Sequence, residues 1–484
     1  MLSKEYLLSQ AGLSVTDHTV SEKWQLGDPI VVQQLTSLAI LCSLLSKDME
    51  IASSEAFNKT KDRSIIADAT NKGILPFAIP HRHTLNIENK SSNRVTLSQN
   101  RIIEDNSGSR IWRLLSSVTI EANSSNTVIV EQSEQREISY IVPLTEMFHR
   151  FEVKVQDDAH LSAVSLKDTL IPVNTYEYNN RWLNVLPNEK SYNILSDERQ
   201  RIFIEFGEST RVGRTAQAGE RYTVTIIETS GEIDTAKLKD ASLEETYSTD
   251  EQKLVLSFKA GGVVQTGTNP YSTQELKFLT SYASTYDPSG VYLGDFDVAM
   301  RRKFLSRTYF LSIWNEAIQE VYYKNVDISY VNHLNVCFVA KNAEEAEQIK
   351  DQMALAIGNQ DNLYKNKRVK FKEVQEVQYS LKIKGNISAL HDVDTVIAQI
   401  KELLIENYGK TTLATHAWVK DGFNKQKIAK LLKDKILAFQ DNMSDFSVLA
   451  NTITYKPHEW VYMTNDSLQV ELDRTAETLS NVWL

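Results

Sequence analysis

The sequence predicts an elongated α+β protein built from several small domains in series. Three patterns predict it. Apolar residues recur at helical spacing near the N-terminus, alternate with polar residues through the middle of the chain, and form alternating strand-like and helix-like runs in the last third. The chain has 484 residues, more than one hydrophobic core usually organises. We expect an N-terminal helical region, central antiparallel β domains, a helical segment and two small consecutive α/β domains.

The expected domain boundaries follow these changes of pattern. They are 1–84 for an N-terminal helical assembly region, 85–160 for a β domain, 161–268 for a second β-rich domain, 269–325 for a helical connector, 326–376 for an α/β domain and 377–484 for a second α/β domain with C-terminal strands.

The first strong helix signal begins at Asp28-Pro29, where aspartate suits the cap and proline the first turn. Large aliphatic residues then follow at spacings of three and four, and almost no charge interrupts them before Lys47. Such a helix needs a cover, either from its own domain or from a partner chain. We name as candidate interface residues Val31, Leu35, Leu38, Leu41 and Leu45.

A second helix is expected over 53–72, followed by Gly73 as its C-terminal cap. From residue 85 the pattern changes to period two. The strands expected in the first β domain are Val95–Leu97, Ile111–Ile120, Thr127–Val130, Ile138–Val142 and Phe151–Val155.

The second β-rich block contains three strand-like runs, Ile202–Phe206, Tyr222–Ile227 and Leu254–Phe258. An acidic, polar stretch at 231–252 separates the last two and is expected to be an exposed excursion. Glycine and proline then punctuate the chain between Gly261 and Pro270, which predicts a domain boundary and a hinge.

The rest of the chain alternates helices with strands, which is typical of two small α/β units. The expected helices are Thr273–Ser284, Phe296–Arg307, Ala343–Ile357, Asp392–Tyr408 and Lys425–Phe439. The expected strands are Leu334–Ala340, Val369–Val374, Tyr379–Gly385, Thr452–Lys456, Trp460–Met463 and Leu468–Leu472.

Charge and hydropathy argue against nucleic-acid and membrane partners. The net charge is −10, so a broad basic surface is not expected. The basic run from Lys365 to Lys372 alternates with other residues and is interpreted as the solvent face of a strand. No signal peptide is apparent, and polar residues interrupt the most apolar segment, Ile30–Leu45. We expect no membrane insertion.

The two cysteines, Cys42 and Cys337, lie in apolar runs and are expected to be small buried residues rather than a disulfide pair or zinc ligands. This cysteine usage suits synthesis in a reducing compartment.

Two groups of residues are candidates for a metal site or a catalytic carboxylate site. His81 and His83 would share one face of a strand, but no further metal ligand is apparent nearby. Asp295 and Asp297 precede a helix, where acidic residues favour capping, although with Asp287 they could also form a carboxylate site.

The sequence contains no phosphate loop, nucleophile elbow, zinc-protease motif or dinucleotide-binding fingerprint. We assign no catalytic, cofactor-binding or metal-binding residue and expect the chain not to be an enzyme.

Several segments, taken in order, resemble the baseplate J-like family of contractile tails. The apolar helix is followed by Glu55-Ala56-Phe57 and by a helix that ends at Gly73. The central block has a strand ending in Phe206-Gly207, then Gly213, Gly219 before a strand, and a Thr229-Ser230-Gly231 turn. Further along come Thr273 to Lys277, Val291 to Asp297, and Lys382 to Gly385 before a helix. The chain departs from the family at Glu208-Ser209, where a further glycine is common.

This resemblance implies a structural wedge subunit of a contractile phage-tail baseplate, located in the virion tail and made in the bacterial host cytoplasm. The implied partners are a second copy of the chain, other baseplate wedge proteins, and neighbouring wedges in a ring around the tail hub. The N-terminal helices would join a helical bundle with partner chains, and the C-terminal α/β units would make contacts between copies. No catalysis and no cofactor is implied.

Two other classes of function remain as alternatives. One is a tail-associated carbohydrate-active or peptide-cleaving enzyme with β accessory domains, which would require a clustered acid pair in a cleft. The other is a host-binding tail fibre, which would usually show sequence repeats. If the wedge hypothesis holds, removing residues 1–73 should leave the rest folded but unable to join its partners.

Overall fold

The chain folds as a multidomain α+β protein, as the sequence predicts. The structure is a computed structural model. It describes residues 6–8, 10, 17–58, 61–108, 110–197, 199–281, 292–324, 326–365, 368–388, 390–420, 422–441, 444–450 and 453–474. We call residues 17–58 the arm and the described residues from 61 onward the body.

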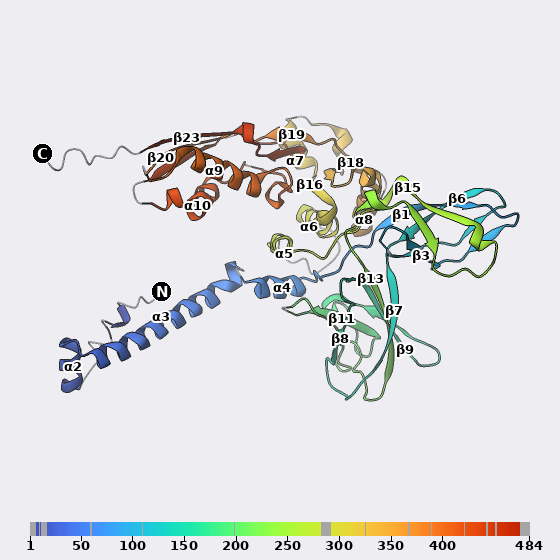
Figure 1. Cartoon of the computed structure of the whole chain (residues 1–484), viewed down its shortest axis with the longest axis horizontal. Coiled ribbons are helices and arrows are strands. Elements are labelled where there is room, and N and C mark those ends of the chain that lie inside the picture. Colours follow the sequence, from blue (N-terminus) through green and yellow to red (C-terminus); the bar gives the residue numbers. More distant parts are fainter. Residues whose placement is uncertain are drawn as a thin grey trace.

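The arm consists of two helices, α2 (His18–Gln25) and α3 (Pro29–Asn58), and Figure 1 shows α3 projecting away from the body. Asp28 caps α3, because its carboxylate accepts hydrogen bonds from the backbone N–H groups of Ile30 and Val31 at 2.9 and 3.4 Å. This confirms the predicted helix start. The helix expected over 53–72 is divided, because α3 continues to Asn58 and a separate helix begins at Asp62.

Helix α4 (Asp62–Asn71) belongs to the body rather than to the arm. Its residues Ile65, Ile66 and Ala69 are buried in a cluster with Leu276, Leu279 and Leu305. Gly73 follows α4 with φ +69°, as expected of a glycine that ends a helix. The region predicted as 1–84 therefore contains two parts, and only the first of them projects.

A closed β barrel follows, built from two separate stretches of sequence. Around the barrel its strands are β1 (Arg82–Asn89), β15 (Leu254–Gln265), β14 (Asp240–Leu243), β3 (Ile102–Asp105), β4 (Ile111–Leu114) and β6 (Ser125–Glu131). A separate short pair, β2 (Val95–Leu97) and β5 (Val118–Ile120), adds its apolar side chains to the barrel core. The barrel core includes fully buried Trp112, whose indole N–H donates to Asp105 Oδ2 at 3.2 Å.

The second β domain is a seven-stranded sheet formed by the sequence between β6 and β14. In spatial order its strands are β7 (Glu134–Ile141), β13 (Arg221–Thr229), β9 (His160–Asp168), β10 (Thr175–Tyr178), β11 (Ser191–Ser196), β12 (Ile202–Phe206) and β8 (Arg150–Val153). One β domain is thus inserted into the other. The strands divide differently from the predicted split at residue 160, because closing the barrel requires β14 and β15 to pair with strands far earlier in the chain.

Two glycines of the central block, Gly207 and Gly213, have a steric reason to be there. A Cβ on Gly207 would overlap the carbonyl oxygen of Val212, and one on Gly213, which has φ +67°, would lie 2.6 Å from Cζ3 of Trp182. The turn after β12 therefore requires close backbone approach at both positions.

The region predicted as a helical connector holds helices and one strand. Its elements are α5 (Thr273–Thr280), α6 (Leu293–Phe304), β16 (Thr308–Trp314) and α7 (Glu316–Tyr323). Ser272 and Glu275 form a capping box at the start of α5. Strand β16 was not predicted and belongs to the sheet of the next unit, whose other members are β17 (Leu334–Ala340) and β18 (Val369–Phe371). Helix α8 (Ala346–Gln360) packs on this sheet beside α6.

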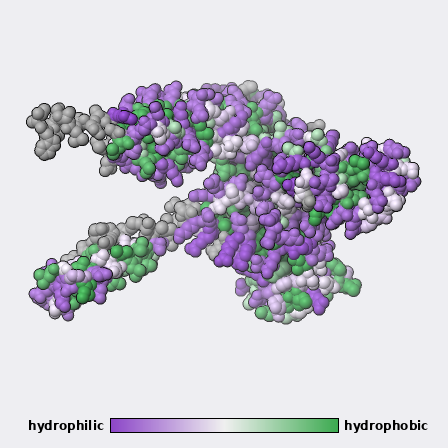
Figure 2. Space-filling view, viewed as in Figure 1, coloured by the Kyte–Doolittle hydropathy of each residue, from purple (hydrophilic) through white to green (hydrophobic). Residues whose placement is uncertain are grey.

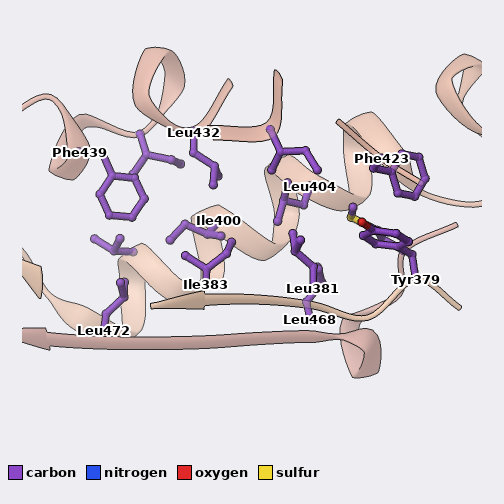
Figure 3. Close-up of a cluster of buried hydrophobic side chains, with 14 of the residues drawn as sticks. Tyr379, Leu381, Ile383, Ile400, Leu404, Phe423, Leu432, Phe439, Leu468 and Leu472 are labelled. Atoms are coloured by element: carbon purple, nitrogen blue, oxygen red, sulfur yellow. The ribbon is translucent and has the colours of Figure 1, made fainter. Parts of the chain in front are cut away.

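The last unit is a second α/β domain, and Figure 3 shows part of its hydrophobic core. Its elements are β19 (Gln375–Gln378), β20 (Leu381–Ile387), α9 (Val393–Tyr408), α10 (Lys425–Lys435), β21 (Asp445–Ala450), β22 (Glu459–Tyr462) and β23 (Leu468–Arg474). Figure 3 shows Ile400 and Leu404 of α9 and Leu432 of α10 packing over strand β20. The strand expected at 452–456 is wrong, because residues 453–456 form no strand. The strand in this part of the chain is β21, which ends at Ala450.

The two α/β units are joined by a small hydrophobic core to which both contribute side chains. Phe310, Trp314 and Cys337 from the first unit pack with Trp460 and Tyr462 of β22. Strand β22 also pairs in parallel with β19, so the end of the chain returns to the junction between the units.

Candidate assembly surfaces

The arm exposes the apolar face that the sequence singled out. Leu38, Leu41 and Leu45 are 58%, 55% and 55% exposed, whereas Val31 and Leu35 are half-buried. Short helix α2 lies against one side of α3 and leaves the rest uncovered by the described part of the chain. Figure 2 shows apolar side chains along the arm. The sequence left open whether α3 is covered by its own domain or by a partner chain. The described residues of its own domain do not cover it.

Four polar residues lie among the apolar side chains of α3, and Ile40 and Leu44 share their side of the helix. Gln33 and Ser37 are one turn apart, and Thr36 and Ser43 lie two turns apart on the neighbouring rows. By length and composition Pro29–Ser46 could cross a membrane, contrary to the expectation from sequence. Only 6% of this segment is buried within the described chain, so it needs a cover, which a partner chain or a membrane would supply.

Cys42 also lies on the arm and is exposed, so the expectation that both cysteines are buried is wrong for this residue. Cys337 is buried in the core between the α/β units, as predicted.

A second apolar surface lies at the free end of the seven-stranded domain. Ile141 pairs with Arg221, and Tyr222 pairs with Asp168, so the loops after β7 and β9 leave the sheet at the same end. Six apolar side chains that are at least half exposed lie in or beside these two loops: Ile141, Leu144, Met147, Leu170, Ile171 and Val173. The carboxylate of Asp168 holds the second loop through hydrogen bonds to Leu170 N and Asn174 N. Sequence reasoning missed this surface, because no periodicity marks a loop.

The carboxylates considered as a site of chemistry have structural roles. Asp295 Oδ2 accepts a hydrogen bond from Tyr292 N at 2.8 Å, which confirms the capping interpretation. Asp297 binds Arg301 through two hydrogen bonds of 2.8 Å. Asp287 lies outside the described residues.

The paired histidines share a face, as predicted, and their rings stack at one end of the barrel with centroids 5.8 Å apart. His81 is fully buried, and its Nδ1 accepts a hydrogen bond from Gly267 N at 3.1 Å. Burial, assisted by the neighbouring His83, lowers the pKa of His81 to about 3. Across the described residues, no group of three or more His, Cys, Asp or Glu side chains is arranged to hold a metal ion.

The depressed pKa of His81 predicts acid lability of the barrel. Below its usual pKa of about 6.5, the unfolded chain binds a proton here that the folded chain excludes, so stability falls as the pH falls. Between pH 7.5 and 5.5 the loss for this group is about 1.4 kcal/mol. His81→Asn, which keeps an acceptor for Gly267 N, should remove that part of the pH dependence of amide hydrogen exchange in β1 and β15. The exposed His18→Asn is the control, and an unchanged pH dependence in His81→Asn would contradict the prediction.

Two solved chains from baseplates are similar to this chain. No protein-family model matches the sequence, and no curated protein matches it. One similar solved chain comes from a cryo-EM structure of the anti-feeding prophage baseplate, with a TM-score of 0.29, 9% identity, and coverage of 98% of this chain and 99% of that chain. Another comes from the type VI secretion system TssK-TssF-TssG baseplate subcomplex, with a TM-score of 0.28, 7% identity, and coverage of 69% and 94%. Both belong to baseplates, but TM-scores this low do not establish a shared fold or function.

Proposed function

We propose that this chain is a structural wedge subunit of a contractile-tail baseplate. In this role it pairs with a second copy, binds other baseplate proteins through its arm, and joins neighbouring wedges into a ring around the tail hub. The observation that carries the proposal is the uncovered apolar face of α3 on an arm that projects from the body. Such a face is stable in water only when another surface covers it, and obligate interfaces are apolar in the same way.

Two further features support this role. The ordered motifs that resemble the baseplate J-like family extend from the arm to the second α/β unit. The body also carries a second apolar surface at the end of the seven-stranded domain, far along the sequence from the arm. A chain with separate docking surfaces can bind several neighbours at once, as a ring of subunits requires.

The proposal assigns no catalytic activity to the chain. The carboxylates and histidines weighed above are used in capping, in ion pairs and in the barrel core. The chain would act by holding other proteins in fixed positions.

The mass of the purified chain in solution, alone and with proteins encoded beside it, tests the proposal. We expect a dimer or a stoichiometric complex with an unrelated chain, measured by light scattering. A stable monomer that ignores those proteins would overturn the wedge role. Screening that monomer for hydrolase activity on peptidoglycan and peptides would then test the enzyme alternative.

A further inference from the structure

A pocket of about 270 Å³ lies where three parts of the body meet. One wall is the segment that joins α4 to β1, a second is the turn between β15 and α5, and the third is the C-terminal end of α6. The lining residues are Gly73, Ile74, Leu75, Phe77, Ile79, Thr268, Asn269, Tyr271, Arg302, Lys303 and Ser306. The first wall is apolar, and the third presents two cationic side chains.

The positive charge in this pocket lacks a counter-charge. In the described part of the chain, no carboxylate lies within ion-pair distance of Arg302 or Lys303. The Nε of Arg302 is shielded from water and has no hydrogen-bond acceptor. Burial and the nearby guanidinium of Arg181 both lower the pKa of Arg302, since each disfavours its charged form.

Three other shielded arginines of the body have acidic partners, although the Nε atoms of Arg101 and Arg307 also lack acceptors among the described residues. Arg101 pairs with Glu251, Arg301 with Asp297, and Arg307 with Glu345. Basic residues in the last turn of a helix are favoured by its dipole, which explains why cations occur at the end of α6. The dipole does not explain why Arg302 is partly buried beside a second guanidinium without an acidic partner, because such burial costs free energy.

The tyrosine on the second wall fixes the cationic wall in place. The hydroxyl of Tyr271 donates to the backbone carbonyl of Arg302 at 2.7 Å. The cations therefore face the apolar segment across a preformed space. An inorganic anion would satisfy Arg302 but would leave the half-buried side chains of Leu75 and Phe77 in contact with water.

We propose that this junction pocket binds a carboxylate carried on an apolar polypeptide segment, namely an aspartate or glutamate side chain beside a large aliphatic residue of a partner protein. The carboxylate would pair with Arg302 and Lys303, and the aliphatic neighbour would cover the apolar wall. This site lies on the body, so it goes beyond the proposed function and does not depend on the arm.

Binding of two matched peptides to the full chain tests the site, measured by ligand-observed NMR. Acetyl-Leu-Asp-Leu-amide should bind, and the neutral acetyl-Leu-Asn-Leu-amide should bind at least tenfold more weakly. Arg302→Gln should weaken the acidic peptide at least tenfold, whereas Arg94→Gln, an equal charge change at an exposed turn of the barrel, should not. Lys303→Gln provides a second variant in case Arg302→Gln impairs folding.

Three outcomes would overturn the proposal. The first is equal binding of the aspartate and asparagine peptides. The second is an equal loss in Arg94→Gln, which would indicate a general charge effect. The third is displacement of the peptide by sodium phosphate at matched ionic strength with equal affinity, which would indicate a site for free oxyanions. None of these results bears on association through the arm, so a failure here is separable from a failure of the wedge role.

Discussion

Replacing Leu38, Leu41 and Leu45 of the arm by glutamine should abolish association with the partner chains and leave the body folded. Each leucine is more than half exposed in the isolated chain, so the substitutions remove nothing from a core. In a complex, each buried leucine contributes about 1.5–3 kcal/mol, and losing three should weaken binding at least about a thousandfold. Co-purification with the neighbouring proteins and circular dichroism of the chain alone measure the two effects.

A matched control lies on the same helix. Gln33→Ala, Thr36→Ala and Ser37→Ala replace polar side chains of α3, keep its leucines and raise helix propensity slightly, so they should leave association intact. If both triple variants lose the partners equally, the apolar face is not the binding surface. If the wild-type chain instead floats with lipid vesicles through Pro29–Ser46 and ignores the partners, the arm is a membrane anchor and the wedge role fails.

The structure also corrects where the arm should be cut. Removing residues 1–60 deletes the arm alone. Removing 1–73, the cut suggested by the sequence, also takes Ile65 and Ile66 from their cluster with Leu276, Leu279 and Leu305. That loss should cost about 3–6 kcal/mol of body stability. A truncation at 73 would therefore confuse loss of binding with loss of folding.

The sequence predicted the local elements well and their assembly less well. The helix start at Asp28, helix α9 and strand β17 follow from residues that lie next to one another, so local patterns contain the information. Closure of the barrel depends on β1 pairing with β15, which begins more than 160 residues later. Period-two patterning shows that a segment is a strand but does not identify its neighbour in the sheet.

Of the candidate binding surfaces, the one built from neighbouring residues was predictable from the sequence, and those built from separate segments were not. The stripe on α3 was predictable because a helix repeats its apolar face at regular spacing. The apolar loops at the end of the seven-stranded domain and the junction pocket were not, because their residues come from separate parts of the chain. Strand β16 was missed because a short apolar run between two helical segments does not by itself distinguish a strand from a helix.

One buried arginine adds a polar network to the apolar core that joins the two α/β units. Arg301 of α6 is 3% exposed and donates to Asp297, to the carbonyl of Leu311 at 2.9 Å, and to His416 Nδ1 at 3.0 Å. The Thr308 hydroxyl donates to Phe304 O, so it accepts from His416 Nε2 at 3.0 Å. This assigns His416 as neutral with its proton on Nε2, in agreement with burial and Arg301 holding its pKa well below the usual value.

Arg301→Gln should therefore destabilise the body by about 3–5 kcal/mol, because it leaves a carboxylate, a carbonyl and an imidazole nitrogen without their donor. The next residue offers the control: Arg302 has no ion pair with any described residue, and Arg302→Gln should cost less than about 0.5 kcal/mol. Chemical denaturation measures both. Combined with His416→Leu, the arginine change should cost less than the sum of the two single changes, since both break the same contact. Equal effects of the two arginine variants, or simple additivity with His416→Leu, would show that this network does not join the units.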